Sequence, residues 1–262
     1  MSSKVWSGHL SCGLITIPVY LTPAARSEAI SFNMLHRTDL SRVKQQLVCS
    51  VDNQVIDRED IVKGYEFRKN EYVTIEPSEI KEIEPTTSDS LEVEEFVDSK
   101  DIDPIYFDAS YHVIPELAGQ KAYSLVAKAM DQSRYVAVGK LSMHNREYTV
   151  IIRHYQGGLL LHTIYYQDEV RKMDENKLPK EQPKPEEVKM AQQFFSALVT
   201  NWEPEKYKDS FRESIQNLIL SKVEGRESPK KTKKVKATAV PDLLEALKKS
   251  MEQAQEKKKA RK

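Results

Sequence analysis

The residues that could perform catalysis or bind a metal are scattered through this sequence. Its six histidines never occur in a ligand spacing such as H-x-x-x-H. Cys12 and Cys49 would complete a zinc site with His9 or His36 only if the fold gathered them. No phosphate loop, dinucleotide fingerprint or nucleophile elbow is present. We therefore predict no catalytic residue, no metal and no cofactor.

Lysine and arginine side chains suggest a different chemistry, the binding of a polyanion. The 262 residues contain 40 Lys+Arg and 40 Asp+Glu, so the formal net charge is zero. The distribution is uneven, because residues 222–262 hold 14 basic and 6 acidic side chains, whereas the other 221 residues hold 26 and 34. An acidic body with a basic tail favours nucleic acid as the partner, although lysine runs can also serve only to keep a tail solvated.

Within the acidic body, two groups of cations are candidates for such binding. Arg37, Arg42 and Lys44 lie within eight positions, in a stretch with no carboxylate after Asp39. The second group lies along or between later predicted strands and comprises Arg134, Lys140, Arg146 and Arg153. These cations are either ion-pair partners of an acidic surface or a basic inner lining that confines a polyanion to one place.

Strand-like runs dominate the chain as far as about Tyr166. Pro18 marks the first run as an edge strand or a bulge. One amphipathic helix is predicted at 119–130. Short strands without a regular strand–helix alternation predict a closed or nearly closed antiparallel barrel, in an α+β, mainly β fold. The predicted strands lie at 13–21, 71–75, 90–97, 135–143, 146–155 and 159–166, and the last three form a meander.

Composition changes near Met173, where a proline-rich connector leads into two amphipathic helices, predicted at 186–202 and 207–223. Their apolar stripes either pack on the barrel or grip a second subunit. In the second case, the contacts would come from Phe195, Leu198, Trp202, Phe211, Ile215 and Leu218.

A lysine-rich linker separates these helices from a last apolar stripe. A helix of about 15 residues is marginal in water by itself. A tethered stripe is therefore better explained as a ligand that folds on docking into another protein than as a helix that folds back. The stripe consists of Leu243, Leu244, Leu247 and Met251.

The remaining features bound the class of protein. The length allows one large or two modest domains. Two cysteines do not form a disulfide framework, and no run approaches the roughly 20 apolar residues that span a bilayer. The N-terminus does not resemble a secretory signal. We expect a cytoplasmic protein.

Several stretches, in order along the chain, resemble a known family. "VWSGHLSCGLITIPVYL", "SFNMLHRTDLSRVKQQLVC", "DIDPIYFDASYHVIPELAGQKAYSLVAKAM" and "LLLHTIYYQDEV" are similar to the bacterial Ku proteins, which bind DNA ends in non-homologous end joining. The terminal "VPDLLEALKKSM" resembles the short element that is associated with recruiting the ATP-dependent end-joining ligase. Each motif alone is weak, but their order and spacing together are specific.

The resemblance implies a domain layout and a mode of action. Two copies would close into a ring that threads onto duplex DNA from a free end and contacts the backbone without reading bases. The protein would associate with the nucleoid and would not be an enzyme. The implied parts are a Ku-core (SPOC-like) barrel at 1–175 with a DNA-encircling bridge at about 32–65, a helical dimerisation arm at 176–225, a lysine-rich linker at 226–238, a ligase-docking helix at 239–256 and a basic tip at 257–262.

On this interpretation, three parts of the chain contact DNA. The bridge contributes the first group of cations and the barrel contributes the second. The tail holds duplex DNA near the ring through Lys230, Lys231, Lys233, Lys234, Lys257, Lys258 and Lys259.

Two other functions stay open on the sequence alone. A chromatin-like DNA-binding protein would rely on its basic tail and would not distinguish circular from linear DNA. A lyase acting on abasic sites or DNA ends would use a lysine or the N-terminal amine as a Schiff-base nucleophile.

Overall fold

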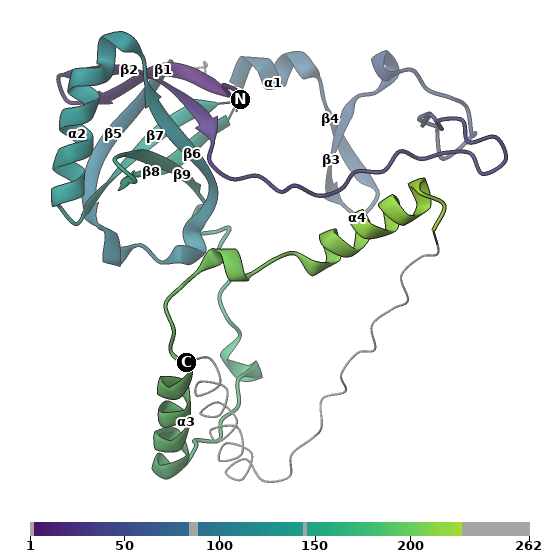
Figure 1. Cartoon of the computed structure of the whole chain (residues 1–262). Coiled ribbons are helices and arrows are strands. Elements are labelled where there is room, and N and C mark those ends of the chain that lie inside the picture. Colours follow the sequence, from purple (N-terminus) through teal and green to yellow (C-terminus); the bar gives the residue numbers. More distant parts are fainter. Residues whose placement is uncertain (1–2, 84–88, 144–145, 227–262) are drawn as a thin grey trace. The chain divides into compact units, whose positions relative to one another are not determined.

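A computed structural model describes residues 3–83, 89–143 and 146–226 of the chain (Figure 1). The chain divides into two compact units, Met1–Lys172 and Met173–Lys262. Residues 144–145, which join the predicted strands at 135–143 and 146–155, lie outside the described residues. So do the linker beyond Arg226, the tail lysines and the stripe with Leu243, Leu244, Leu247 and Met251.

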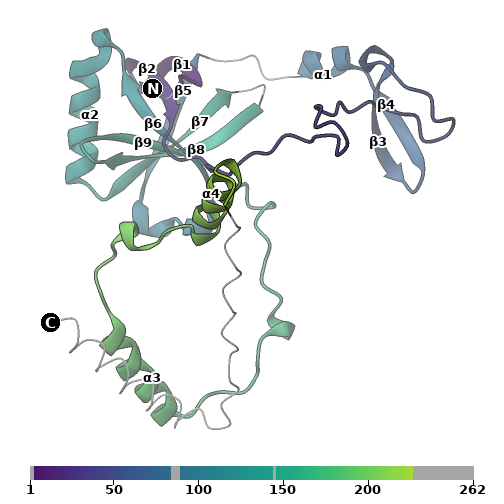
Figure 2. The same cartoon turned by 45° about the vertical axis from the view of Figure 1, so that its right-hand side comes forward.

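The first unit is built on a closed seven-stranded barrel (Figures 1 and 2), which confirms the predicted fold class. The strands are joined in the order β1-β2-β6-β9-β8-β7-β5. All neighbouring pairs are antiparallel except β1 and β5, whose parallel pairing closes the barrel. The strand bounds are β1 Trp6–Cys12, β2 Ile15–Pro23, β5 Ser90–Asp98, β6 Phe107–Pro115, β7 Tyr135–Met143, β8 Arg146–Tyr155 and β9 Gly158–Ile164.

The predicted meander corresponds to β7, β8 and β9. Gln156 and Gly157 both have positive φ angles, 47° and 83°, and form the two-residue turn between β8 and β9. Such turns match the right-handed twist of the strands that they join. Alternate residues of the two strands, among them Val150, Ile152 and Leu161, face the buried core of the barrel.

The interpretation of Pro18 as an edge or bulge marker was wrong, because β2 pairs with β1 on one side and β6 on the other. Pro18 is nevertheless accommodated. The ladder with β6 begins at Val19, and the carbonyl of Pro18 accepts a hydrogen bond from the Glu116 amide just beyond the end of β6. The missing N–H of Pro18 therefore faces a position where the ladder requires no donor.

The predicted helix at 119–130 corresponds to α2, Gln120–Gln132. Its buried residues, Tyr123, Ala127 and Met130, join the core of the barrel. They are spaced by four and three residues, which places them on one face of the helix.

Between β2 and β5 the chain makes a long excursion, which comprises residues 24–89. It contains the hairpin of β3 (Lys63–Arg68) and β4 (Glu71–Ile75) and the short helix α1 (Pro77–Ile83). The strand predicted at 71–75 is thus confirmed, but it lies outside the barrel. No described residue of the excursion is buried.

The second unit contains α3 (Pro185–Leu198) and α4 (Ser210–Val223). The first predicted helix ends four residues earlier than expected, so Trp202 lies outside it, where its ring stacks on Tyr207 with 4.9 Å between centroids. Residues of low helix propensity follow α3, and a proline comes soon after them.

The start of α4 is fixed by a side-chain cap. The carboxylate of Asp209 accepts hydrogen bonds from the amides of Phe211 and Arg212. These bonds satisfy backbone donors that have no partner within the first turn of the helix.

Short 3₁₀ turns complete the described structure at Arg58–Asp60, Ser99–Asp101, Pro104–Tyr106, Leu117–Gly119, Glu175–Lys177 and Pro204–Lys206. No helix in the described ranges is long and apolar enough to cross a membrane.

Candidate nucleic-acid interface

The first group of cations lies on the excursion and is exposed. Leu35 bridges to Arg42, and the intervening turn is closed by Asp39, whose carboxylate accepts hydrogen bonds from the Ser41 amide and hydroxyl at 3.1 and 2.9 Å. These bonds hold the pKa of Asp39 below its usual value. The Asp39 carboxylate therefore stabilises this turn. Among the described residues, no carboxylate forms an ion pair with Arg37, Arg42 or Lys44.

Two cations of the second group are paired with carboxylates. Lys140 Nζ lies 2.9 Å from Glu94 Oε1, and this hydrogen bond raises the pKa of the lysine. Arg146 Nη2 lies 3.3 Å from Glu169 Oε1. Each charge is partly cancelled at its own site, so these two cations would have to exchange a partner to contact a phosphate.

The other two cations, Arg134 and Arg153, are brought together. They line one open hollow of about 280 Å³ with His154, where the start of β7 meets the end of β8. In the part of the chain that the structure describes, neither arginine forms an ion pair. Asp131 also lines the hollow, but its carboxylate contacts Lys128 Nζ at 3.1 Å and His154 Nδ1 at 3.2 Å.

Arg153 is held by a histidine. Its Nε donates to Nε2 of His162 at 2.9 Å, and its guanidinium lies over the ring of Tyr155 with 5.2 Å to the centroid. An arginine nitrogen can only donate, so Nε2 must be the acceptor, and the proton of the imidazole must be on Nδ1. Nδ1 then donates to the Ser110 hydroxyl at 2.9 Å.

His162 is uncharged under ordinary conditions. It is buried on β9, against the ring of Phe107, with 4.7 Å between centroids. Burial, together with the nearby positive charge of Arg153, lowers the pKa of His162 to about 4. The imidazole therefore orients the guanidinium without cancelling its charge.

Sequence reasoning did not select Ser110, His162 or Tyr155. A usable signal existed for His162: the two-residue turn at Gln156 and Gly157 fixes the register of β8 and β9, so that Arg153 lies opposite Leu160 and diagonal to His162. Ser110 comes from β6, and only the order of strands in the barrel brings it close.

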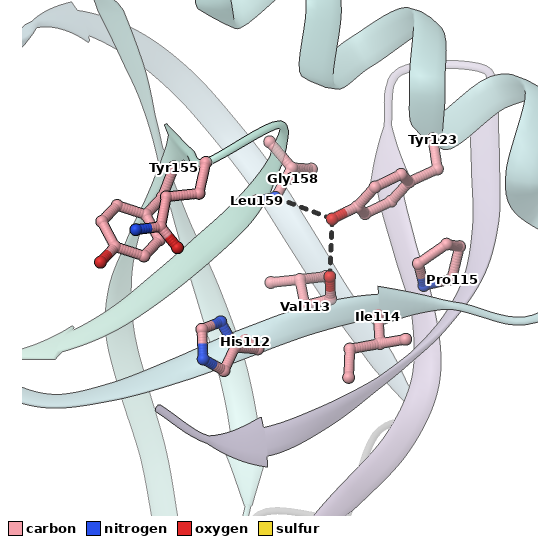
Figure 3. A pocket seen from close by; sticks show the side chains of 9 residues that line it. His112, Val113, Ile114, Pro115, Tyr123, Tyr155, Gly158 and Leu159 are labelled. Atoms are coloured by element: carbon pink, nitrogen blue, oxygen red, sulfur yellow. Dashed lines mark hydrogen bonds between the residues drawn. The ribbon is translucent and has the colours of Figure 1, made fainter. Parts of the chain in front are cut away.

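A second hollow, of about 380 Å³, lies at the rim of the barrel (Figure 3). The buried hydroxyl of Tyr123 donates to the Val113 carbonyl and accepts from the Leu159 amide, both at 2.7 Å. These bonds join α2 to β6 and β9, so the tyrosine has a structural role. His112 and Tyr155 also line this hollow.

Large apolar side chains are exposed on both the excursion and the second unit. Val51 on the excursion is 90% exposed, and Trp202 and Phe211 in the second unit are 74% and 73% exposed. Of the other candidate dimer contacts, Phe195 and Leu198 are exposed, and Ile215 and Leu218 are partly buried. Large contiguous apolar patches are rare on the surfaces of monomeric soluble proteins and are characteristic of interaction sites.

The structure brings together no metal site in the ranges that it describes: no group of three or more His, Cys, Asp or Glu side chains there could hold an ion. Cys12 and Cys49 are free thiols.

Comparison with known proteins decides the family. Residues 11–190 match the family described as "Ku70/Ku80 beta-barrel domain". The chain is 48% identical over 259 residues to the "Non-homologous end joining protein Ku" of Koribacter versatilis, covering 99% of this chain and 89% of that protein. The chain belongs to the Ku family. The resemblance found in the sequence is thereby confirmed.

Other Ku proteins are similar over nearly their whole length. The Ku protein of Solibacter usitatus is 43% identical, covering 99% of this chain and 97% of its own. The Ku protein of Archaeoglobus fulgidus is 33% identical over 94% of this chain and 97% of its own. The matched Ku domain begins at the end of β1 and extends through the rest of the barrel and the excursion into α3.

Proposed function

We propose that this protein binds the ends of double-stranded DNA, independently of sequence, as a ring-shaped homodimer, and that it recruits an ATP-dependent ligase in non-homologous end joining. The relatives named above carry "non-homologous end joining" in their names. The observation that carries the proposal is the excursion: its cations Arg37, Arg42 and Lys44 form no ion pair with a described carboxylate, and none of its described apolar side chains is buried.

The apolar side chains support the homodimer. In a lone subunit the described excursion and arm bury no residue, although they carry many large apolar side chains. Monomeric soluble proteins rarely expose large contiguous apolar patches. A second copy is the simplest partner, since it brings the same surfaces in a symmetric arrangement.

The cations support backbone binding. Arg37, Arg42 and Lys44 are exposed and free of ion pairs with the described carboxylates, so each can approach a phosphate without first losing a partner. Each phosphate neutralised contributes about −0.9 to the slope of log affinity against log salt. Acidic residues elsewhere in the body would disfavour binding to the outside of the ring.

The tail binds the ligase and adds further contacts to the DNA backbone. Leu243, Leu244 and Leu247 form a tethered stripe suited to a groove on the ligase, and the flanking lysines suit the phosphate backbone. Replacing the three leucines with Asp is expected to abolish ligase stimulation while end binding is kept.

A competition experiment tests the central claim. The full chain is bound to a linear duplex and challenged with the same duplex carrying open ends or covalently closed hairpin ends. We expect the open duplex to compete well and the closed one poorly. Equal competition would rule out threading from an end and favour the chromatin-like alternative.

A set of substitutions with a matched control tests whether the cations of the excursion contact DNA. Replacing Arg37, Arg42 and Lys44 with Gln should lower the salt slope. The control is Lys177→Gln, whose ammonium already pairs with Asp174 at 3.6 Å, and it should leave the slope unchanged.

We infer that the protein is a scaffold, not an enzyme, and that it acts at the nucleoid. A covalent adduct trapped by borohydride on abasic DNA would instead demonstrate an accessory lyase.

A further inference from the structure

The hollow with Arg134 and Arg153 combines charge with rigidity. Arg153 is held at Nε by His162, and its ring contact with Tyr155 limits the guanidinium further. Its Nη1 is 3.5 Å from the His154 carbonyl, which leaves the other N–H groups of the guanidinium available. Arg134 lines the same hollow.

The nature of the partner distinguishes Arg153 from its neighbours. Lys140 and Arg146 are held by carboxylates, which cancel charge locally. A carboxylate beside Arg153 would orient it equally well but would also compete with an incoming anion. A neutral imidazole acceptor orients the guanidinium and leaves its charge intact. A fixed, uncancelled guanidinium favours planar, bidentate recognition of phosphate.

We propose that the hollow lined by Arg134 and Arg153 binds a phosphodiester of the duplex, and that His162 is a positioning residue that aims Arg153 at it. This inference rests on the proposed binding of duplex DNA. Ser110 belongs to the same device, because its hydroxyl accepts from Nδ1 and so keeps Nε2 of His162 as the acceptor that Arg153 needs.

The other charged groups of the hollow are compatible with a phosphate. Asp131 is the carboxylate that lines it, and its oxygens contact Lys128 and His154. These contacts hold the pKa of Asp131 below its usual value, so the carboxylate stays ionised, and the Lys128 ammonium at 3.1 Å partly balances its charge. Ser99 and Ser133 add polar groups to the lining.

The test is a double-mutant cycle on the full chain, with the affinity for an open linear duplex measured at several salt concentrations. Arg153→Gln should weaken binding about tenfold, the effect of one hydrogen bond to a charged group. The magnitude of the salt slope should fall by about 0.9 for each phosphate that the variant no longer neutralises. His162→Phe keeps a ring against Phe107 but removes the acceptor, and it should weaken binding by a smaller factor.

Coupling is the decisive readout. If His162 acts through Arg153, the double variant should bind no worse than Arg153→Gln. His162→Gln, which offers an amide oxygen in place of Nε2, should recover part of the affinity. If His162→Phe fails to fold, Ser110→Ala can be used instead, because it removes the acceptor of the Nδ1 proton and so weakens the positioning of Arg153 with a smaller change to the core.

Several results would overturn the inference. Additive effects of the two substitutions would show that His162 supports the fold and not the arginine. An unchanged salt slope in Arg153→Gln would show that no phosphate is bound there. Inorganic phosphate and duplex DNA can be compared, at equal phosphate concentration, for how well they protect Arg153 from an arginine-modifying reagent. Equal protection would show that the hollow binds the free ion. If the wild type fails to prefer open ends, the proposed function fails; if it prefers them and the variants are unaffected, only this inference does.

Discussion

Removing the hydroxyl of Tyr123 is the sharpest single-atom test of how this fold is held together. The hydroxyl is buried and shared between the Val113 carbonyl and the Leu159 amide, at 2.7 Å each (Figure 3). Its burial raises the pKa of the phenol, so it is a neutral donor and acceptor at all relevant pH values. Tyr123→Phe keeps the ring in the core and deletes only these two bonds.

The magnitude follows from the two groups left behind. A buried donor or acceptor without a partner costs about 1–3 kcal/mol, so two such groups would cost about 2–6 kcal/mol in a dry site. The hollow beside Tyr123 has about 380 Å³ of open space, so water can reach at least one of them. We therefore expect the free energy of unfolding to fall by about 2–3 kcal/mol. For a unit of this size, the corresponding fall in Tm is about 4–12 °C.

Urea unfolding of the full chain measures the change in the free energy of unfolding, and calorimetry measures the change in Tm. The control is Tyr155→Phe, in the same hollow, because the described structure shows no hydrogen bond from that hydroxyl and the side chain is exposed. The control should change stability by less than about 0.5 kcal/mol. If the two variants were equally stable, the bridging hydroxyl would contribute nothing, and the role assigned to Tyr123 would be wrong.

Three further predictions concern the barrel and the proposed dimer. The pKa of His162 is about 4 in the folded chain and 6.5 ordinarily, so the unfolded chain binds one more proton than the folded chain between these pH values. The free energy of unfolding should therefore fall by at most about 3 kcal/mol as the pH drops from 6.5 to 4. In His162→Gln, the free energy of unfolding should depend less on pH in this range. Gly139→Ala places a Cβ against the backbone carbonyl oxygen of Glu92, so it should cost about 3 kcal/mol or more in denaturant unfolding, whereas Gly157→Ala, with φ of 83° and open space, should cost only about 1 kcal/mol. Phe211→Asp should weaken self-association in sedimentation experiments, and an unchanged dimer would remove α4 from the interface.

Local sequence patterns were sufficient for most, but not all, of the individual elements. Alternation or apolar, β-branched runs predicted β2, β4, β5, β7, β8 and β9, and an amphipathic pattern predicted α2, whereas β1, β3 and β6 were not predicted. These signals depend on neighbours within a few residues, where backbone preferences act directly. The ends of elements were less well predicted, as the early end of α3 shows.

What the sequence by itself determined is therefore six of the nine described strands, the barrel class of the fold and the family, through motifs in a fixed order. Only the tertiary structure decided which charges are cancelled. Lys140 has a carboxylate partner from β5, whereas Arg153 has a neutral one from β9 that is fixed in turn by Ser110 of β6. The parallel closure of β1 on β5 was equally invisible. The physical reason is that such partners are set by the order and register of strands far apart in the chain, and residue types alone do not encode those distances.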